Sequence, residues 1–336
     1  MKKAILAVLA LASVVACNKS EVLEVAPQKA ISFGNPFVDN STKAPIDPSL
    51  THGTDGTLTE FNVYGVLKNS NNAQTKIFDN VKVTKTQKEA TDISGTNTWF
   101  YDGDAVQYWI PGNKYTFAAL ANGTAATYGD DLLPATVSYT ANGTTDLLYA
   151  TSKVDITTGD VDFSSNIAFT FNHLLSKVKF TFKNEYPADS KLVVTVSNIK
   201  ITNAIASGVC TLSTKSWANT GENATTTMSF GNIVSTATEE GAAAAEVTAA
   251  GLESNFERLL IPGQSSFAVT FDAKVTLNNV LVNSYTGATV AVDGGLQPGY
   301  SYNFVGTIGK TLDKITFSVE KVNGYELADN ENITLQ

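Results

Sequence analysis

Short runs rich in Val, Ile, Thr, Phe and Tyr recur along the chain and are separated by clusters of Asn, Gly, Asp and Pro. The clearest runs cover residues 61–67, 77–86, 115–120, 168–182, 192–202, 267–277 and 300–308. Within 177–183, apolar and polar residues alternate, which places one face of a strand on a core and the other in water. We find no sustained helical period. The pattern therefore predicts an all-β protein built of antiparallel β-sandwiches.

A weak internal repeat suggests how these strands are divided. Residues 111–117 and 298–304 share the pattern Pro-Gly-x-x-Tyr-x-Phe, and residues 262–267 form a looser third copy. Pro presets one turn torsion, Gly supplies a positive φ, and aromatics two positions apart fall on one face of the strand that follows. The length of 336 residues also exceeds that of an average single domain. We expect two tandem sandwich domains, covering residues 44–163 and 164–336.

The N-terminus has the features of an export signal. Lys2 and Lys3 precede an apolar run, residues 4–16, which reaches Cys17 directly after Val14-Val15-Ala16. This run is well short of the roughly 20 residues of a membrane-spanning helix, so residues 1–16 are interpreted as a cleaved signal peptide. The sequence Val-Val-Ala-Cys resembles a bacterial lipobox, in which the cysteine carries the lipid anchor that holds the protein on a membrane. An ordinary secretory signal with a chance cysteine is the alternative.

Charge and cysteine content exclude several classes of partner and bond. The formal net charge is −9, and loss of the two signal-peptide lysines makes the mature chain more acidic, so we expect no nucleic-acid partner. Once Cys17 is acylated, Cys210 is the remaining cysteine and cannot form an internal disulfide. The strand-like sequence around Cys210 favours its interpretation as a small buried residue over a reactive thiol.

The chain is poorly equipped for catalysis. It contains two histidines, His52 and His173, and one arginine, Arg258, and it lacks the Gly-x-Ser-x-Gly, His-Glu-x-x-His, P-loop and Cys-x-x-Cys motifs. His173 follows a strand-like run and is interpreted as a hydrogen-bonded packing residue. We expect a protein that is not an enzyme and that needs no cofactor.

Acidic and aromatic clusters offer two further candidate sites. The pairs at 102/104 and 130/131 lack the ligand spacing of an EF-hand, so solvated turns are favoured and no metal site is expected. Paired carboxylates from distant strands remain open as a hydrolase site. The aromatics Trp99, Tyr101, Tyr108 and Trp109 favour a core but would form a sugar-binding platform if exposed and coplanar. Their exposure decides whether the chain is instead a glycan-binding surface lipoprotein.

The order of several short motifs resembles the fimbrillin family of Bacteroidales. These motifs are the lipobox, Phe-x-Val-Tyr-Gly at 61–65, Tyr-Trp-Ile-Pro-Gly at 108–112, Asp-Leu-Leu-Tyr-Ala at 146–150, Phe-Thr-Phe-Asn-His-Leu-Leu-Ser-Lys-Val at 169–178 and Leu-Gln-Pro-Gly-Tyr-Ser-Tyr at 296–302. The resemblance covers most of the mature chain. It implies transthyretin-like (Ig-like) sandwiches, export as an outer-membrane lipoprotein precursor, and assembly with other fimbrillin subunits into a homo- or hetero-polymeric fimbrium on the cell surface.

The resemblance also implies proteolytic maturation. Many members of the family lose an N-terminal strand at a basic residue within Thr-Arg-Ala, and this chain has Thr42-Lys43-Ala44 in that place, with lysine instead of arginine. Cleavage between Lys43 and Ala44 would remove residues 17–43 as a pro-segment. Without cleavage, the subunit would keep its lipid and serve as an anchor or a monomeric surface protein.

The C-terminus supplies a candidate donor strand within residues 314–336. Ile315, Phe317 and Val319 alternate with polar residues, and Ile333 and Leu335 repeat that period near the end of the chain. A strand of this kind fills an open groove in a neighbour and propagates a filament. The alternative is that residues 315–319 form the last strand of their own sandwich. We therefore expect a structural fimbrial subunit or a fimbria-associated adhesin, for which host or bacterial surface ligands are further candidate partners.

Overall fold

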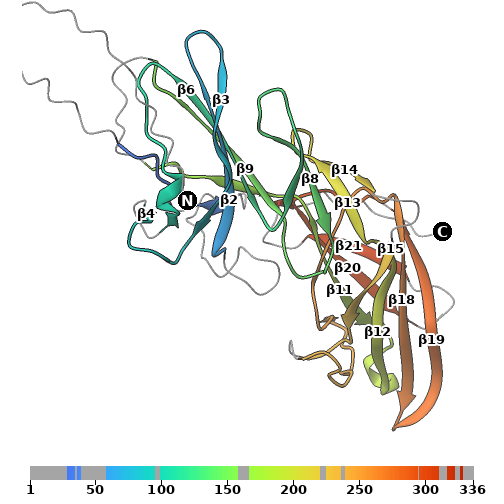
Figure 1. Ribbon diagram of the computed structural model, residues 1–336. Coiled ribbons are helices and arrows are strands. Elements are labelled where there is room, and N and C mark those ends of the chain that lie inside the picture. The colour runs from blue at the N-terminus through green and yellow to red at the C-terminus, as the bar shows by residue number, and fades with distance from the viewer. Residues whose placement is uncertain are drawn as a thin grey trace, which may run out of the picture.

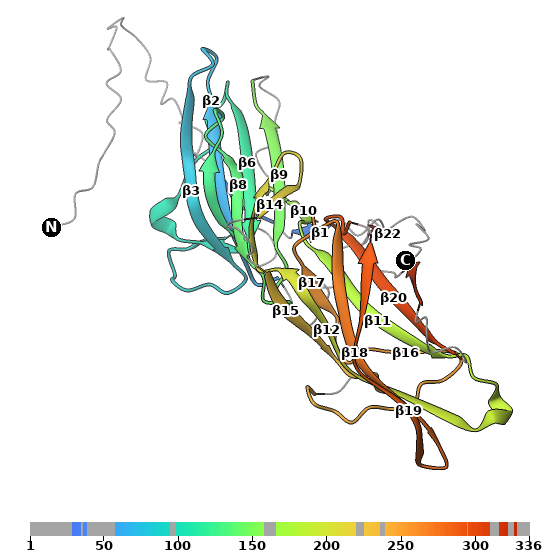
Figure 2. The ribbon, with the colours of Figure 1, turned by 90° about the vertical axis from the view of Figure 1, so that its right-hand side faces the viewer.

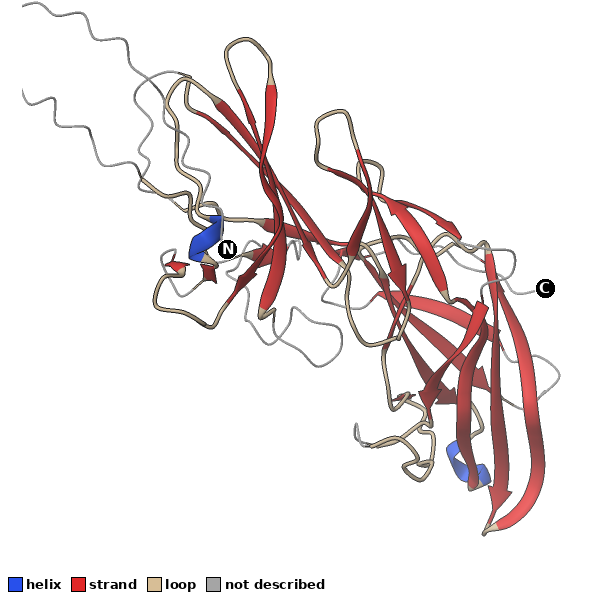
Figure 3. Ribbon diagram, in the orientation of Figure 1, coloured by secondary structure: helices blue, strands red, loops and turns tan. Residues whose placement is uncertain are grey.

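The computed structural model describes residues 29–34, 36–38, 58–94, 99–157, 166–219, 225–235, 239–293, 295–309, 316–321 and 326–327. Their regular secondary structure consists almost wholly of strands, joined by loops (Figure 3). The helices among them are two short 3-10 turns, η2 (Gly103–Ala105) and η3 (Ala188–Ser190). The all-β prediction is confirmed. Over the same residues, no helix has the length and apolar character needed to span a membrane.

The first sheet has eight strands in the order β1-β10-β9-β6-β2-β3-β5-β4. Their bounds are β1 (Phe37–Val38), β2 (Glu60–Lys68), β3 (Gln74–Thr84), β4 (Ile93–Ser94), β5 (Phe100–Tyr101), β6 (Lys114–Ala121), β9 (Leu148–Asp155) and β10 (Thr170–His173). Neighbouring strands are antiparallel except for β1 and β10. Because Phe61 and Val63 of β2 lie in one core and Tyr64 and Val66 lie in another, this sheet is buried on both faces.

The two faces are covered in different ways. One face forms a core rich in aromatic side chains with segments that lie outside the long strands, including residues 31–33, 99–109 and 167–169. The other face packs on a four-stranded sheet of order β14-β13-β8-β7. Its strands are β7 (Thr124–Tyr128), β8 (Pro134–Thr140), β13 (Ser207–Thr211) and β14 (Ser216–Asn219).

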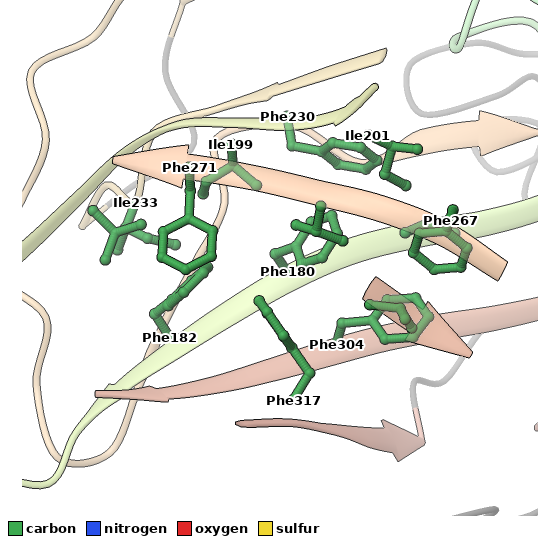
Figure 4. Close-up of a cluster of buried hydrophobic side chains, with 14 of the residues drawn as sticks. Phe180, Phe182, Ile199, Ile201, Phe230, Ile233, Phe267, Phe271, Phe304 and Phe317 are labelled. Atoms are coloured by element: carbon green, nitrogen blue, oxygen red, sulfur yellow. The ribbon is translucent and has the colours of Figure 1, made fainter. Parts of the chain in front are cut away.

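The C-terminal part of the chain forms a second sandwich. One sheet contains β11 (Ser176–Asn184), β16 (Leu252–Glu253), β17 (Arg258–Leu260), β20 (Tyr300–Ile308), β21 (Thr316–Lys321) and β22 (Glu326–Leu327). The facing sheet contains β12 (Leu192–Ile205), β15 (Thr225–Gly231), β18 (Ser266–Leu277) and β19 (Val280–Asp293). The alternation predicted for 177–183 is confirmed, because Val178, Phe180 and Phe182 of β11 enter the core between these sheets (Figure 4).

Strand pairing crosses the predicted boundary at residue 163. The strand β10 and the hairpin β13–β14 follow that boundary in sequence, yet they pair with β9 and β8 of the preceding half. The division into domains at residues 44–163 and 164–336 stays a prediction. Figures 1 and 2 show an elongated molecule with the β2–β3 turn at one end and the β18–β19 turn at the other.

Candidate functional site

A short extended segment near the N-terminus is inserted between two parts of the chain that follow it. We call residues 29–34 the inserted strand. On one side, the Ile31 amide donates to the Gln107 carbonyl (2.8 Å), and the Trp109 amide donates to the Lys29 carbonyl (3.0 Å). On the other side, Ile167 donates to Ser32 and Gly34 donates to Ile167, each at 2.9 Å. The segment thus completes backbone hydrogen bonding on both flanks.

The apolar side chains of the inserted strand are part of the first core. Ile31 and Phe33 are fully buried. The Phe33 ring stacks on Phe169, with 6.0 Å between centroids, and meets Phe78 and Tyr101 edge-on at 5.5 Å. A ring with several aromatic neighbours contributes both buried area and edge-to-face attraction. Phe33 therefore fills a groove that would otherwise expose aromatic core side chains.

Polar contacts fix the register of the inserted strand. The Tyr101 hydroxyl donates to the Ile31 carbonyl at 2.6 Å, and the Ser32 hydroxyl donates to the Asn166 side-chain oxygen. Burial raises the pKa of Tyr101, so its hydroxyl stays protonated and remains a donor. The strand β1 continues the same path, because Phe37 pairs in parallel with Thr170.

The inserted strand lies within residues 17–43, the predicted pro-segment or tether, and the hydrophobic pattern there does not single out Ile31 and Phe33. The available signal was the short alternation Ile31-Ser32-Phe33. Three residues are too few to establish a strand period. Their partners, at positions 107 and 167, are far away in sequence.

Most of the predicted site residues lie outside the described part of the chain. This applies to Cys17, Lys43, Ala44, Ile315, Ile333 and Leu335. Phe317 is described and is 3% exposed. Its ring meets those of Phe180 and Phe182 edge-on at 5.9 and 5.6 Å. Val319 lies opposite Phe304 in the antiparallel pairing of β21 with β20, so β21 belongs to the sandwich of its own chain in this structure.

The aromatic cluster does not form a sugar-binding platform. Trp99, Tyr101 and Trp109 are 2%, 2% and 7% exposed, whereas Tyr108 is 41% exposed. Trp109 meets Tyr115 edge-on, with an interplanar angle of 76°, rather than lying in a common plane with its neighbours. The cluster therefore lacks the exposed, coplanar rings on which the glycan-binding alternative depends.

The side chains considered for catalysis or metal binding have environments typical of structural residues. His173 is buried and shares a hydrogen bond between its Nδ1 atom and the Asp146 carboxylate, as its interpretation as a packing residue predicts. Burial raises the pKa of the Cys210 thiol to about 12 and so suppresses the reactive thiolate. Among the residues that the structure describes, no group of three His, Cys, Asp or Glu side chains is arranged to hold a metal ion.

A polar cleft of about 750 Å³ lies near the start of β2 and the start of β13. Amide and hydroxyl side chains predominate in its lining, including those of Asn62, Ser138 and Thr140. Glu60 is the one carboxylate among its described lining residues, and it forms an ion pair with Lys82 at 2.8 Å. This lining lacks the two facing carboxylates on which glycoside hydrolysis depends.

The chain is similar in sequence and in structure to known proteins. A sequence profile of a family described as Fimbrillin-like matches residues 50–321. A fimbrial protein from Bacteroides vulgatus is similar in structure, with a TM-score of 0.63 and 15% identity over 87% of this chain and 98% of that one. A proposed cell adhesion protein from Bacteroides ovatus has a TM-score of 0.50 and 16% identity over 90% and 99% of the two chains. No curated protein sequence matches the chain.

Proposed function

The chain belongs to the fimbrillin-like family, and from this premise we propose that it is a structural subunit of a cell-surface fimbria that assembles by strand donation. In this proposal, each subunit loses its inserted strand, and a segment from a neighbour takes the vacated groove. The contact runs from one subunit to the next without closing, so it generates a filament. If the protein is instead a fimbria-associated adhesin, it assembles in the same way but occupies the end of the fimbria.

The observation that carries this proposal is the inserted strand itself. It precedes the proposed cleavage site between Lys43 and Ala44, while the described segments outside it that it contacts follow that site. Cleavage would therefore break the covalent link between the inserted strand, with Ile31 and Phe33, and the core in which these two side chains are buried. Their departure would leave backbone groups unpaired on both flanks and aromatic side chains exposed. An open edge of this kind is a template for another strand.

One cleavage would also release the subunit from the membrane. The proposed lipid attachment at Cys17 lies on the same side of Lys43 as the inserted strand. The lipid-bearing peptide and the strand that occupies the groove would leave together. An anchored precursor would thus become competent for assembly at the step that detaches it from the outer membrane, which limits assembly to the cell surface.

The proposed donor is the C-terminal segment, residues 314–336. Ile333-Thr334-Leu335 reproduces the apolar, hydroxyl, apolar order of Ile31-Ser32-Phe33. A donor with that order would bury two side chains and place a small hydroxyl between them. Ile315, Phe317 and Val319 offer a second segment with the same period, and donation of that segment would require β21 to leave the sheet of its own sandwich.

The experiment that tests this function compares Lys43→Ala with Lys43→Arg in the lipidated protein. A trypsin-like protease should release wild type and Lys43→Arg from the membrane with Ala44 as the new N-terminus, and electron microscopy should then show filaments. Lys43→Ala should stay membrane-bound and unassembled, because the bond lacks a basic residue before it.

Two results would count against the proposal. A mature N-terminus far from Ala44 would refute the placement of the cleavage site. A correctly cleaved protein that remains monomeric would refute assembly by strand donation. The second result would leave the lipid attachment untouched, which Cys17→Ser tests separately through loss of the protein from the membrane fraction.

A further inference from the structure

The end of the molecule farthest from the first sheet exposes a cluster of apolar side chains. Leu277, Val280, Leu281 and Val282 are 37%, 67%, 56% and 56% exposed. We call these four residues the apolar turn. They flank Asn278 and Asn279, whose φ angles of 48° and 64° form a tight two-residue hairpin connection between β18 and β19. Three consecutive exposed aliphatic residues, whose side chains point alternately to the two faces of β19, make both sides of the hairpin tip apolar and indicate a contact surface.

A second exposed apolar pair flanks the groove of the inserted strand. Tyr108 and Ile110 are 41% and 52% exposed, and they alternate with the buried Trp109. We call this pair the groove rim. Tyr108 forms a bridge with Ala30, near the first residue of the inserted strand, and the Ile110 amide donates to the Tyr115 hydroxyl at the start of β6. The groove rim therefore lies beside the end of the groove where the inserted strand begins.

The groove rim belongs to the end of the molecule opposite the apolar turn. Lys114, the first residue of β6, pairs with Lys68 at the end of β2 and with Asp155 at the end of β9. In both views the β2–β3 turn and the start of β6 lie at the upper end, and the β18–β19 turn lies at the lower end (Figures 1 and 2). The two apolar surfaces thus occupy opposite ends of an elongated subunit.

The strand β20, which precedes the proposed donor, ends next to the apolar turn. Ile308, at the end of β20, pairs with Asn184 of β11. The Asn184 side chain donates to the Leu192 carbonyl at 3.3 Å, and Leu192 pairs with Leu277 of the apolar turn. If residues 314–336 are donated, β21 leaves its sheet and the chain departs from this end of the subunit, because Thr316 at the start of β21 lies opposite Thr307. That tail and its linker, residues 310–336, span at most about 90 Å when extended.

The chain direction of the inserted strand in the groove is consistent with a donor tail that comes from the β18–β19 end of a neighbouring subunit. The inserted strand runs from Tyr108 at the groove rim toward Thr170, which lies beside β1. A tail that enters at the rim and follows the same path has the same direction as the strand it replaces. The neighbour that supplies it would then present its β18–β19 end to the groove rim.

We propose that the apolar turn of one subunit docks on the groove rim of the next copy of this chain, in a contact that rests on the proposed strand donation. Leu281 and its neighbours cover Tyr108 and Ile110, and the donated tail passes beside them into the groove. The contact removes both exposed apolar surfaces from water and fixes the angle between successive subunits. It accounts for apolar side chains at the two ends of the molecule that stay exposed among the residues that the structure describes.

Crosslinking tests the geometry of this contact. A Leu281→Cys and Ile110→Cys double variant should give a ladder of covalent oligomers when cleaved, assembled and treated with a short thiol-specific crosslinker. Each single variant should give monomers, as should Thr289→Cys with Ile110→Cys, because Thr289 lies on the same strand but away from the turn. Assembled filaments without a ladder, or links between two copies of Leu281→Cys alone, would overturn the proposal.

A charge substitution tests the energetics. Leu281→Asp should raise the critical concentration for assembly about tenfold, equivalent to about 1.4 kcal/mol, since it would bury a charge without a partner at the contact. The control Thr289→Asp adds the same charge to the same exposed strand and should assemble like wild type. Both variants should melt like wild type as uncleaved monomers.

The outcomes separate this contact from the proposed function. Filaments that require the tail but ignore Leu281→Asp would overturn the contact and leave strand donation standing. A cleaved wild type that forms no filaments would overturn both. Binding of the monomer to phosphatidylethanolamine and phosphatidylglycerol vesicles that Leu281→Asp abolishes, with unchanged assembly, would assign the apolar turn to a lipid surface and overturn the contact.

Discussion

At the scale of single residues, the repeated Pro-Gly-x-x-Tyr-x-Phe motif has the same structure in both copies. Gly112 and Gly299 have φ angles of 83° and 81°. The rings of the following aromatics stack in both copies, Tyr115 on Phe117 and Tyr302 on Phe304, with 6.1 and 6.2 Å between centroids. The positive φ and the shared face follow from turn chemistry and the strand period, and both were predictable from sequence.

The role of the tyrosine hydroxyls was not predictable in this way. The Ile110 amide donates to the Tyr115 hydroxyl at 2.8 Å, and the Gln297 amide donates to the Tyr302 hydroxyl at 3.0 Å. Each bond ties the strand back to the residue five positions earlier and closes the turn. The pattern of apolar positions places the ring but does not determine where its hydroxyl finds a partner.

The repeat predicts matched effects of two substitutions. Tyr115→Phe and Tyr302→Phe should each lower the free energy of unfolding by about 1 kcal/mol, because each removes the hydroxyl that accepts a hydrogen bond from the turn amide and keeps the ring. Urea denaturation measures both values. Tyr128→Phe is the control, since this exposed hydroxyl donates to Asp79 at 3.3 Å and its loss should have little effect. Unchanged stability in the first two variants would contradict a structural role for the repeat.

At the scale of elements, the long strands were predictable and the short inserted strand was not. The predicted run 192–202 lies within β12, and the predicted runs 267–277 and 300–308 match β18 and β20 closely. These strands carry enough alternating positions to show their period. The inserted strand is identified by its surroundings instead, because its two flanks come from distant parts of the chain. Sequence periodicity does not report such pairings.

The burial of Phe33 predicts a stability effect that depends on maturation. In the uncleaved protein, Phe33→Ala should lower the free energy of unfolding by about 3–5 kcal/mol, the range for removing a buried aromatic ring. Thermal or urea denaturation measures this loss, and the exposed Lys29→Ala in the same segment serves as the control. In filaments whose subunits begin at Ala44, the substituted residue is absent, so the stability of filaments from both precursors should be equal. A small effect in the precursor would contradict the role of Phe33 in filling the groove.

At the scale of the whole molecule, composition and strand pattern established the all-β class, but not which strands share a sheet. The hairpin β13–β14 joins β8, about 70 residues earlier in the chain, rather than the neighbouring strand β12. Its apolar side chains Cys210 and Leu212 enter the core beneath the first sheet. The choice between two available sheet edges depends on packing across the folded molecule. Local propensity and turn residues do not encode it.

The C-terminal segment predicts how assembly depends on the tail as a whole. If Ile333 and Leu335 occupy the groove of a neighbour, then Ile333→Asp, Leu335→Asp and deletion of residues 323–336 should each leave a folded monomer that cleavage no longer converts into filaments. A charge at either position would enter an apolar groove without a partner, whereas a donated segment would contribute little to its own sandwich. Asn330→Asp adds the same charge at a polar position of the tail and should assemble normally.

The same variants separate the two donor segments. Phe317 lies in the core of its own sandwich, 6.1 Å from the Phe271 ring between centroids, so Phe317→Asp should lower the melting temperature of the monomer whether or not it is also donated. The Ile333 and Leu335 variants should melt like wild type and lose assembly alone. Normal filaments from the deletion of 323–336 would remove Ile333 and Leu335 from the mechanism and leave residues 315–319 as the donor. Loss of monomer folding on that deletion would instead place residues 323–336 in their own domain and would count against their donation to a neighbour.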